Sequence, residues 1–370
     1  MSYYKKAVFF AFGIKLLYIF AGNLFPGAWN GWEHVLDVLS RNDSGWYHQI
    51  ARDGYPHTAP VEGQQSSFAF FPLYPFLISL LRPVFLLFTN NLDLVFVLSA
   101  FTLHLATTVV WVKLVFKYLG VRGLAERQIF IFLALFQCFP FHYFHHVFYS
   151  EQLFVILVFW LLYSTYRLKG VQMALAAFLL SLCRPTGIVI SAGVGFMLLH
   201  ESGWLKIFKD RNRLTALFGL AAAPLALLLW SGYLYLHCGD ALAFSNSQGA
   251  WGRHYNWPWE SLFPNSFWFV QVLSAYVVLL FILAIWLLKN AGLGEKIFMA
   301  LNMIFPLITG NVTSYYRFMS VLPPFFINLF SKMERHWLLF GGVLMLLNLS
   351  LFYIWVCYTG GKSPAEWLSF

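Results

Sequence analysis

Long apolar segments separated by short polar ones recur along the whole of this 370-residue chain. A helix needs about 20 apolar residues to cross the hydrocarbon core of a bilayer, where a helix is stable because its backbone hydrogen bonds are internal. The sequence therefore predicts an all-α polytopic membrane protein with roughly 10–12 transmembrane helices. The candidate helices are residues 7–25, 68–88, 92–117, 128–146, 151–167, 171–183, 186–200, 214–237, 268–288, 296–311, 316–331 and 337–358.

The composition supports this class and excludes two others. Hydrophobic residues make up 60% of the chain and charged residues 11%, whereas soluble domains carry about 25% charged residues. The net charge is +9, but the basic residues fall in short segments between the apolar ones. That distribution is typical of cytoplasmic loops beside anionic headgroups, so we exclude a soluble domain and a nucleic-acid-binding protein.

Basic segments predict the orientation, because cytoplasmic loops are enriched in Lys and Arg. The segments assigned to the cytoplasm are Lys5-Lys6, Lys117–Arg127, Arg167–Lys169, Lys206–Arg213, Lys289–Lys296 and Lys332–Arg335. The loops left outside are 26–67, 147–151, 184–186, 238–267 and 311–317. We interpret residues 1–370 as a single integral membrane domain, with 26–67 as its first extracytoplasmic loop and 238–267 as a second polar outer loop.

Two places bear on this scheme. Residues 68–116 hold two apparent spans, which would return the chain to the outside before the basic segment 117–127. Either 68–88 enters the membrane without crossing it, which its prolines permit, or one basic loop departs from the charge rule. At the N-terminus, Lys5 and Lys6 precede an apolar run without a small-residue cleavage site, which predicts a retained first membrane helix.

The first outer loop carries two helical patterns. Trp32, Val35, Leu36 and Leu39 are spaced i, i+3, i+4 and i+7, which predicts an amphipathic helix lying at the membrane surface. A second short helix is expected over residues 43–52, ending at the Gly and Pro that follow.

A carboxylate lies on this second helix. Asp43, Trp46, Tyr47 and Ile50 share one face, which puts the carboxylate beside two aromatic rings at the bilayer surface. Partial desolvation raises the basicity of a carboxylate, so Asp43 is a candidate general base. The alternative is that Asp43 only caps the helix.

Histidines and a second acid gather at the start of the apolar run 151–167. Ionisable groups at membrane depth are costly and mark functional sites. The cluster consists of His142, His145, His146, Tyr149, Ser150 and Glu151. His142 and His146 have the i, i+4 spacing of zinc ligands, but no further ligand completes an obvious set. We interpret the histidines as contacts to headgroups or substrate, and a metal site remains the less favoured alternative.

Two arginines stand at the predicted outer ends of membrane helices. Arg184 precedes Pro185 between two apolar runs, which form either one broken helix or two helices, and Arg317 opens another run. A guanidinium there can bind a lipid phosphate through two hydrogen bonds. The alternative is that each side chain reaches to the interface without binding substrate.

The second outer loop interleaves aromatic and hydrogen-bonding side chains. The residues concerned include Gln248, Trp251, Arg253 and His254. Such a mixture suits the faces of sugars, and it equally suits an aromatic belt at the membrane interface.

Five motifs, taken in order, resemble one protein family. They are Asp43–Tyr47 with Ile50, Ala51, Gly54 and Tyr55; Phe70–Pro75; Tyr149–Glu151; Arg184–Gly187; and Tyr316-Arg317 with Pro323 and Pro324. Over most of its length the chain resembles the second mannosyltransferase of GPI-anchor synthesis and its bacterial relatives, which are polytopic glycosyltransferases of the GT-C class. A Trp often precedes the acid in the family's first motif, whereas Asn42 stands there in this chain.

The resemblance implies a GT-C-type bundle with amphipathic juxtamembrane helices in its first outer loop. It implies a polyprenyl- or dolichyl-phosphate-linked sugar donor, typically a phosphomannose, and a lipid or glycan acceptor. Asp43 would be the catalytic base of an inverting transfer, and Arg184 and Arg317 would hold the donor phosphate. Phosphate is already a good leaving group, so no metal or other cofactor is required.

The other expected site residues bind sugar or acceptor. They are Trp46, Tyr47, Tyr74, His146, Tyr149, Glu151, Tyr316, Gln248, Trp251, Arg253 and His254. The short 238–267 loop and the lack of an ER-retrieval signal favour a bacterial inner-membrane protein, with its active site on the extracytoplasmic face.

Two other classes of protein compete with a transferase. A transporter or lipid flippase would show paired broken helices in two related halves, but only one break, at Arg184-Pro185, is visible. A scaffold without chemistry would leave the outer cluster of Asp43, Glu151, Arg184 and Arg317 unexplained. The sequence leaves the sugar, the acceptor and the oligomeric state open.

Overall fold

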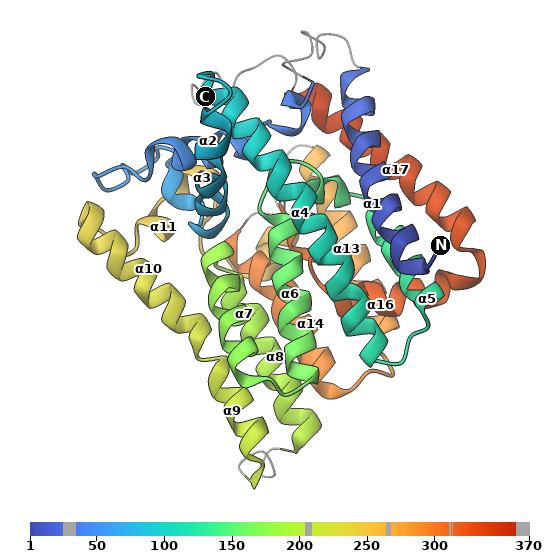
Figure 1. Ribbon diagram of the computed structural model, residues 1–370. Coiled ribbons are helices and arrows are strands. Elements are labelled where there is room, and N and C mark those ends of the chain that lie inside the picture. The colour runs from blue at the N-terminus through green and yellow to red at the C-terminus, as the bar shows by residue number, and fades with distance from the viewer. Residues whose placement is uncertain (25–34, 204–208, 264–267, 311, 313, 360–370) are drawn as a thin grey trace. The chain divides into compact units, whose positions relative to one another are not determined.

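The computed structural model describes residues 1–24, 35–203, 209–263, 268–310, 312 and 314–359, and over these it is helical without a β-strand (Figure 1). The chain divides into two compact units. Unit 1 comprises Met1–Tyr55, Pro72–Ile156 and Phe330–Phe370, and unit 2 comprises Pro56–Phe71 and Leu157–Leu329. The predicted all-α polytopic class is confirmed.

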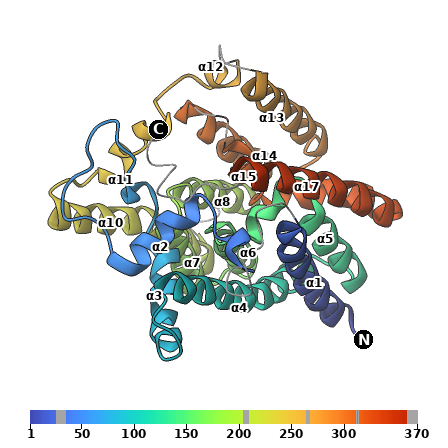
Figure 2. The ribbon, with the colours of Figure 1, turned by 90° about the horizontal axis from the view of Figure 1, so that it is seen from above.

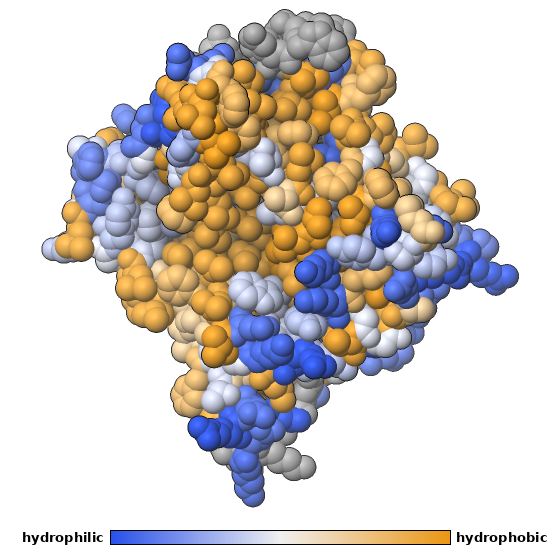
Figure 3. Space-filling view, in the orientation of Figure 1, coloured by the Kyte–Doolittle hydropathy of each residue, from blue (hydrophilic) through white to orange (hydrophobic). Residues whose placement is uncertain are grey.

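Unit 1 gathers the N-terminal helices and the last one. Its elements, with η marking a 3₁₀ helix, are α1 (Tyr3–Asn23), η2 (Asp37–Leu39), α2 (Asp43–Asp53), α3 (Leu73–Leu86), α4 (Leu92–Val121), α5 (Glu126–Cys138), η4 (His142–His145), the start of α6 (Glu151–Tyr166), the end of α16 (Pro323–Met333), η8 (Glu334–His336) and α17 (Trp337–Thr359). Helix α1 packs against α4, α5 and α17, and α3 packs against α2 and α4 (Figures 1 and 2). Hydrophobic side chains cover the face of α3 and upper α4 seen in Figure 3, as expected for a surface in contact with lipid.

Unit 2 holds the middle of the chain. Its elements are η3 (Ser67–Ala69), the rest of α6, α7 (Gly170–Cys183), α8 (Gly187–Ser202), α9 (Arg211–Gly219), α10 (Ala222–Cys238), α11 (Ala243–Asn246), η6 (Gly249–Trp251), α12 (Pro258–Leu262), α13 (Trp268–Leu287), α14 (Leu293–Ile304), η7 (Phe305–Thr309), α15 (Tyr315–Met319) and most of α16. Helix α8 packs against α14, and α7 packs against α9 and α10. A Cβ atom at Gly193 of α8 would lie 2.7 Å from the ring of Phe298 in α14, so this contact depends on a small residue, as is common between membrane helices. Hydrophilic side chains gather around α9 (Figure 3).

Within the ranges that the structure describes, five helical stretches are long and apolar enough to cross a membrane: Tyr3–Asn23, Leu92–Val121, Arg211–Cys238, Val270–Leu287 and Pro323–Val356. Shorter apolar helices are Leu73–Leu86, Glu151–Tyr166, Gly170–Cys183 and Gly187–His200. With 14 residues, α3 is about 21 Å long and falls short of the roughly 30 Å hydrocarbon core. Its length favours the alternative in which 68–88 enters the membrane without crossing it.

Among the described residues, five predicted helices are interrupted: 68–88, 128–146, 214–237, 296–311 and 316–331. Each break lies near a proline, and the hydrophobic pattern alone does not show the effect of a proline on the backbone. Helix α5 ends at Cys138, two residues before Pro140, because a proline disfavours helical backbone in the residue before it. Helices α9 and α10 separate just before Pro224, whose ring would clash with the carbonyl of Leu220 in a continuous helix.

The loop helix expected around Trp32 to Leu39 begins outside the described residues, which resume at Val35. Its described end is a single 3₁₀ turn, Asp37–Leu39, with Val38 and Leu39 buried. At Arg184-Pro185 the chain turns between two separate helices, α7 and α8, which pack against each other. This settles the choice between one broken helix and two.

Candidate functional site

Helix α2 confirms the short helix predicted in the first outer loop. It runs from Asp43 to Asp53 and ends at Gly54, whose φ of 79° suits a residue without a side chain. Ser44, Tyr47 and Ile50 are buried, so this side of the helix faces the protein. Asn42 occupies the N-cap position and Asp43 lies inside the first turn. The cap position that the alternative assigned to Asp43 is thus held by its neighbour Asn42.

Three side-chain contacts dock the N-terminal half of α2 onto residues 148–150. The hydroxyl of Ser44 donates to the Phe148 carbonyl at 3.1 Å, and the Tyr47 hydroxyl donates to Ser150 Oγ at 2.9 Å. The third contact comes from Tyr149, whose hydroxyl oxygen accepts the backbone N–H of Asp43 at 3.2 Å. Buried hydrogen bonds of this kind fix orientation as well as contribute stability.

The residue before Asp43 has an unusual backbone. Asn42 has φ 53° and ψ −118°, a region that costs a non-glycine residue about 1–3 kcal/mol. The same Tyr149 hydroxyl donates to the Arg41 carbonyl at 3.1 Å, so it bonds the backbone on both sides of Asn42. Arg41 in turn donates from its guanidinium to the Val356 carbonyl of α17 at 2.9 Å.

The other end of α2 rests on α3 and α4. The Arg82 guanidinium donates to the Ala51 carbonyl. The His48 ring stacks on Phe96 with 4.6 Å between centroids, and its Nδ1 lies 3.6 Å from the Asp93 carboxylate. Burial lowers the pKa of His48, although Asp93 acts in the opposite direction. His48 is therefore held mainly as a neutral packing residue at neutral pH.

Tyr74 and Glu151, two further candidates, are fully buried in unit 1. The Tyr74 ring meets Tyr47 edge-on at 4.8 Å between centroids, and its hydroxyl lies 2.9 Å from His104 Nε2. Glu151 opens α6, directly after the residues that dock α2. Trp46 is half-buried on α2.

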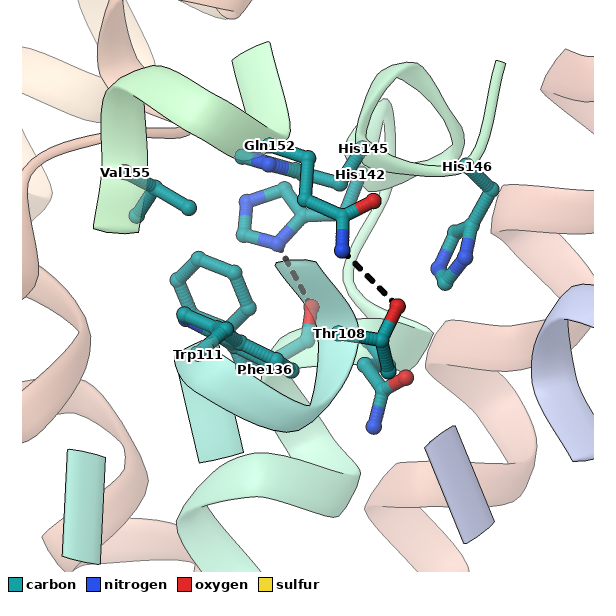
Figure 4. A pocket seen from close by; sticks show the side chains of 9 residues that line it. Thr108, Trp111, Phe136, His142, His145, His146, Gln152 and Val155 are labelled. Atoms are coloured by element: carbon teal, nitrogen blue, oxygen red, sulfur yellow. Dashed lines mark hydrogen bonds between the residues drawn. The ribbon is translucent and has the colours of Figure 1, made fainter. Parts of the chain in front are cut away.

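His146, expected to contact headgroups or substrate, is buried inside unit 1. It stacks on Tyr18 at 4.7 Å and is 5% exposed. Together with His142, His145 and Gln152 it lines a cavity of about 20 Å³ (Figure 4), which has room for about one water molecule. Neither ring nitrogen of His146 makes a hydrogen bond within the part of the chain that the structure describes.

Sequence reasoning did not single out the polar residues beside this cavity. Gln152 Nε2 donates to Thr108 Oγ1 at 2.8 Å, and Gln152 Oε1 accepts from Lys15 Nζ at 3.2 Å. A signal for them existed, because Lys15 and His104 are ionisable residues within the apolar segments 7–25 and 92–117.

The metal alternative for His142 and His146 rested on the i, i+4 spacing of an α-helix. Residues 142–145 form a 3₁₀ turn after the end of α5. His142 Nδ1 donates to the Phe136 carbonyl (Figure 4). Within the described ranges, no three or more His, Cys, Asp or Glu side chains form a group that could hold a metal ion.

In unit 2, the connection between α7 and α8 positions Arg184. Arg184 itself is extended, with φ −156° and ψ 148°, as expected before a proline. A Cβ atom on Gly187 would lie 2.5 Å from the Leu180 carbonyl. The tight approach of the two helices at this turn therefore requires glycine at position 187.

Arg184 and Arg253 converge on one aromatic ring. The Arg184 guanidinium carbon lies 5.2 Å from the centroid of Phe318, and that of Arg253 lies 5.8 Å from it. Arg317 is the chain neighbour of this phenylalanine in α15. Cation–π attraction fixes each guanidinium, and the shared ring brings two positive charges from distant segments together.

The rest of the second outer loop packs on two neighbouring segments of unit 2. Trp251 meets Phe70 edge-on at 5.7 Å, and Gln248 Nε2 lies 3.5 Å from the Ala69 carbonyl. The His254 N–H donates to the Thr309 carbonyl at 3.1 Å, while its side chain is exposed. Tyr316 is half-buried in α15. Of the four candidates in this loop, the structure brings Arg253 to Arg184.

Comparison with known proteins identifies the chain's relatives. The family described as mannosyltransferase (PIG-V) matches residues 25–263, which is more than half of the chain. The matched range includes Asp43, Tyr149, Arg184 and Arg253. No curated protein matches the chain. On the strength of the family match and the apolar helices, the chain belongs to the mannosyltransferase (PIG-V) family and is a multi-pass membrane glycosyltransferase.

Proposed function

We propose that the protein transfers mannose from a polyprenyl- or dolichyl-phosphate-linked donor to a lipid or glycan acceptor, with inversion at the anomeric carbon. The Asp43 carboxylate takes the proton of the acceptor hydroxyl while that oxygen bonds to the anomeric carbon. The bond from this carbon to the phosphate oxygen breaks, and polyprenyl phosphate leaves with the electron pair. A phosphate leaving group needs no divalent metal, so we propose a metal-independent reaction.

The observation that carries the proposal is the anchoring of Asp43. Its backbone N–H and the side chains of Ser44 and Tyr47 are all bonded to residues 148–150. A general base must stay within hydrogen-bond reach of the proton that it removes, and small displacements of catalytic groups cost large factors in rate. The docking of α2 holds Asp43 in one place, which supports this role.

The arginine pair supports the phosphate-linked donor. Two guanidinium groups on one ring repel each other, and a phosphate that accepts hydrogen bonds from both would relieve that repulsion. We propose that Arg184 and Arg253 grip the donor phosphate, with Arg317 beside them. Arg253 thus joins the two arginines expected from the sequence.

Charge within unit 2 supports an extracytoplasmic site. Helix α8 begins three residues after Arg184 and has 16 residues, about 24 Å. Near its far end, His200 lies beside Gly292, where a Cβ atom would be 3.8 Å from the imidazole. Gly292 belongs to the basic segment Lys289–Lys296, which the charge rule assigns to the cytoplasm. We propose that the arginine pair faces the extracytoplasmic side, in a bacterial inner membrane.

The test uses purified protein in nanodiscs with radiolabelled polyprenyl-phosphate mannose, and a membrane lipid extract as the acceptor source. We expect the extract to stimulate release of polyprenyl phosphate, and EDTA to leave the rate unchanged. Asp43→Asn should abolish release and keep donor binding. Asp53→Asn is the matched control, because Asp53 is an exposed acid at the other end of α2, paired with Arg52. Normal release by Asp43→Asn would show that Asp43 is not the base. If wild type neither releases polyprenyl phosphate nor binds the donor, the result would favour a transporter or flippase.

A further inference from the structure

The turn before α2 is held in a conformation that its own sequence disfavours. Asn42, at φ 53° and ψ −118°, occupies a region that glycine adopts freely and other residues avoid. The N–H of Gly45 donates to the Asn42 carbonyl at 2.8 Å, and the N–H of Ser44 donates to the Arg41 carbonyl at 3.3 Å. These bonds close the turn, but they do not remove the strain at Asn42.

The hydroxyl of Tyr149 bridges this turn from outside. It accepts the Asp43 N–H at 3.2 Å and donates its only proton to the Arg41 carbonyl at 3.1 Å. The side chain is 1% exposed, so solvent does not supply a substitute for either bond. The N–H of the preceding Phe148 donates to the Leu39 carbonyl at 2.9 Å, which fixes the segment that carries the tyrosine.

We infer that Tyr149 is a positioning residue for Asp43: its hydroxyl holds the strained Asn42 turn and thereby fixes the direction of the Asp43 carboxylate. The inference rests on the proposed role of Asp43 as the base. It replaces the sequence-based expectation that Tyr149 contacts the sugar or the acceptor, because its hydroxyl proton is committed to the backbone.

Because the Asn42 turn is strained, a second substitution that removes the strain should reverse the effect of losing the Tyr149 hydroxyl. Tyr149→Phe removes the bridging hydroxyl and keeps the ring, so the turn can relax and Asp43 can move. Adding Asn42→Gly removes the strain, so the turn remains populated without the bridge. Adding Asn42→Ala instead keeps the strain. A tyrosine that touched the substrate would not be rescued by glycine at position 42.

Two readouts are measured on the intact protein in nanodiscs. One is polyprenyl phosphate release from polyprenyl-phosphate mannose with lipid extract, resolved into kcat and the donor KM. The other is amide hydrogen exchange of the peptide that spans residues 41–53, which does not depend on turnover. Tyr118→Phe is the matched control, because Tyr118 is a buried tyrosine of α4 whose hydroxyl accepts from Arg122 at 3.1 Å.

For Tyr149→Phe we expect kcat to fall about 10-fold or more with an unchanged donor KM, and exchange of the 41–53 peptide to rise. Asn42→Gly in that background should restore both, and Asn42→Ala should restore neither. Tyr118→Phe should match wild type. Unchanged hydrogen exchange of the 41–53 peptide in Tyr149→Phe would overturn the inference. So would a fall in kcat that Asn42→Gly does not reverse. Absence of release by wild type would instead count against the transferase proposal, and the exchange data would still decide whether Tyr149 holds the turn.

Discussion

Lys15 Nζ donates to Gln152 Oε1 at 3.2 Å inside unit 1, and the lysine is 2% exposed. The lysine lies in α1, one of the membrane-crossing candidates, and no carboxylate of a described residue lies within ion-pairing distance of it. A buried ammonium group with a neutral partner keeps most of its desolvation cost. Its partner Gln152 also lines the neighbouring cavity, together with three histidines.

Replacing Lys15 by Met should therefore stabilise the fold. Methionine fills a similar volume without a charge, so we expect the free energy of unfolding to rise by about 1–3 kcal/mol. Thermal unfolding in detergent measures the change. Lys5→Met is the control, because Lys5 is an exposed lysine of the same helix and its loss should change stability little. A lower melting temperature for Lys15→Met would show that the ammonium group has a stabilising partner.

Removing either arginine of the pair should weaken donor binding. The proposed grip on the phosphate uses charge-assisted hydrogen bonds, so Arg184→Gln and Arg253→Gln should each raise the donor dissociation constant about 10-fold or more. Binding of radiolabelled polyprenyl-phosphate mannose in nanodiscs measures this. Arg167→Gln serves as the control, because Arg167 belongs to a basic segment assigned to the cytoplasm. If both variants bind the donor as tightly as wild type does, Arg184 and Arg253 do not bind the donor phosphate.

Gly187→Ala should disturb the turn that presents Arg184. The added Cβ would overlap the Leu180 carbonyl, so α7 and α8 must separate, and we expect the free energy of unfolding to fall by about 1–3 kcal/mol. Gly232→Ala is matched to it, because nothing lies within 4 Å of a Cβ at that helical position. There, alanine should stabilise α10 by about 0.5–1 kcal/mol. Equal melting temperatures for the two variants would contradict the close approach of α7 and α8 at Gly187.

His48 should make stability depend on pH. Burial holds its folded-state pKa below the ordinary value of 6.5, so the unfolded chain binds more protons as the pH falls below about 6.5. Stability contributed by neutral His48 is therefore present above that pH and is lost on acidification towards the folded-state pKa. Melting temperatures of wild type and His48→Phe between about pH 7.5 and 5 measure this.

The His48→Phe variant should lose less stability on acidification than wild type. His336→Phe provides the comparison, because His336 is exposed and its replacement should leave the pH dependence unchanged. If wild type and His48→Phe respond to acid alike, His48 does not titrate in a buried position.

Much of the fold followed from the sequence because a bilayer permits few solutions. Apolar runs of helix length can only be helices in lipid, and each predicted run contains a helix in the structure. The hydrophobic pattern predicted uninterrupted helices through Pro140 and Pro224, where the structure has breaks. There the ring and the missing N–H of proline decide the backbone locally.

The site was predictable in part. A short helix ending at Gly54 could be read from turn chemistry, and α2 confirms it. Lys15 and His104 could have been noticed as ionisable residues in apolar runs. The Tyr149 bridge could not, because it depends on an Asn42 backbone that no propensity favours and on a contact across 106 positions of the chain.

By itself, the sequence determined the class of the molecule: a helical membrane protein with its polar chemistry in a few loops. Only the tertiary structure decided which loop residues meet. It joined Arg253 to Arg184 through Phe318, and it joined Tyr149 to the backbone of Asp43. The physical reason is that hydrophobic periodicity acts locally along each segment, whereas hydrogen bonds and ring contacts between distant segments depend on how helices pack.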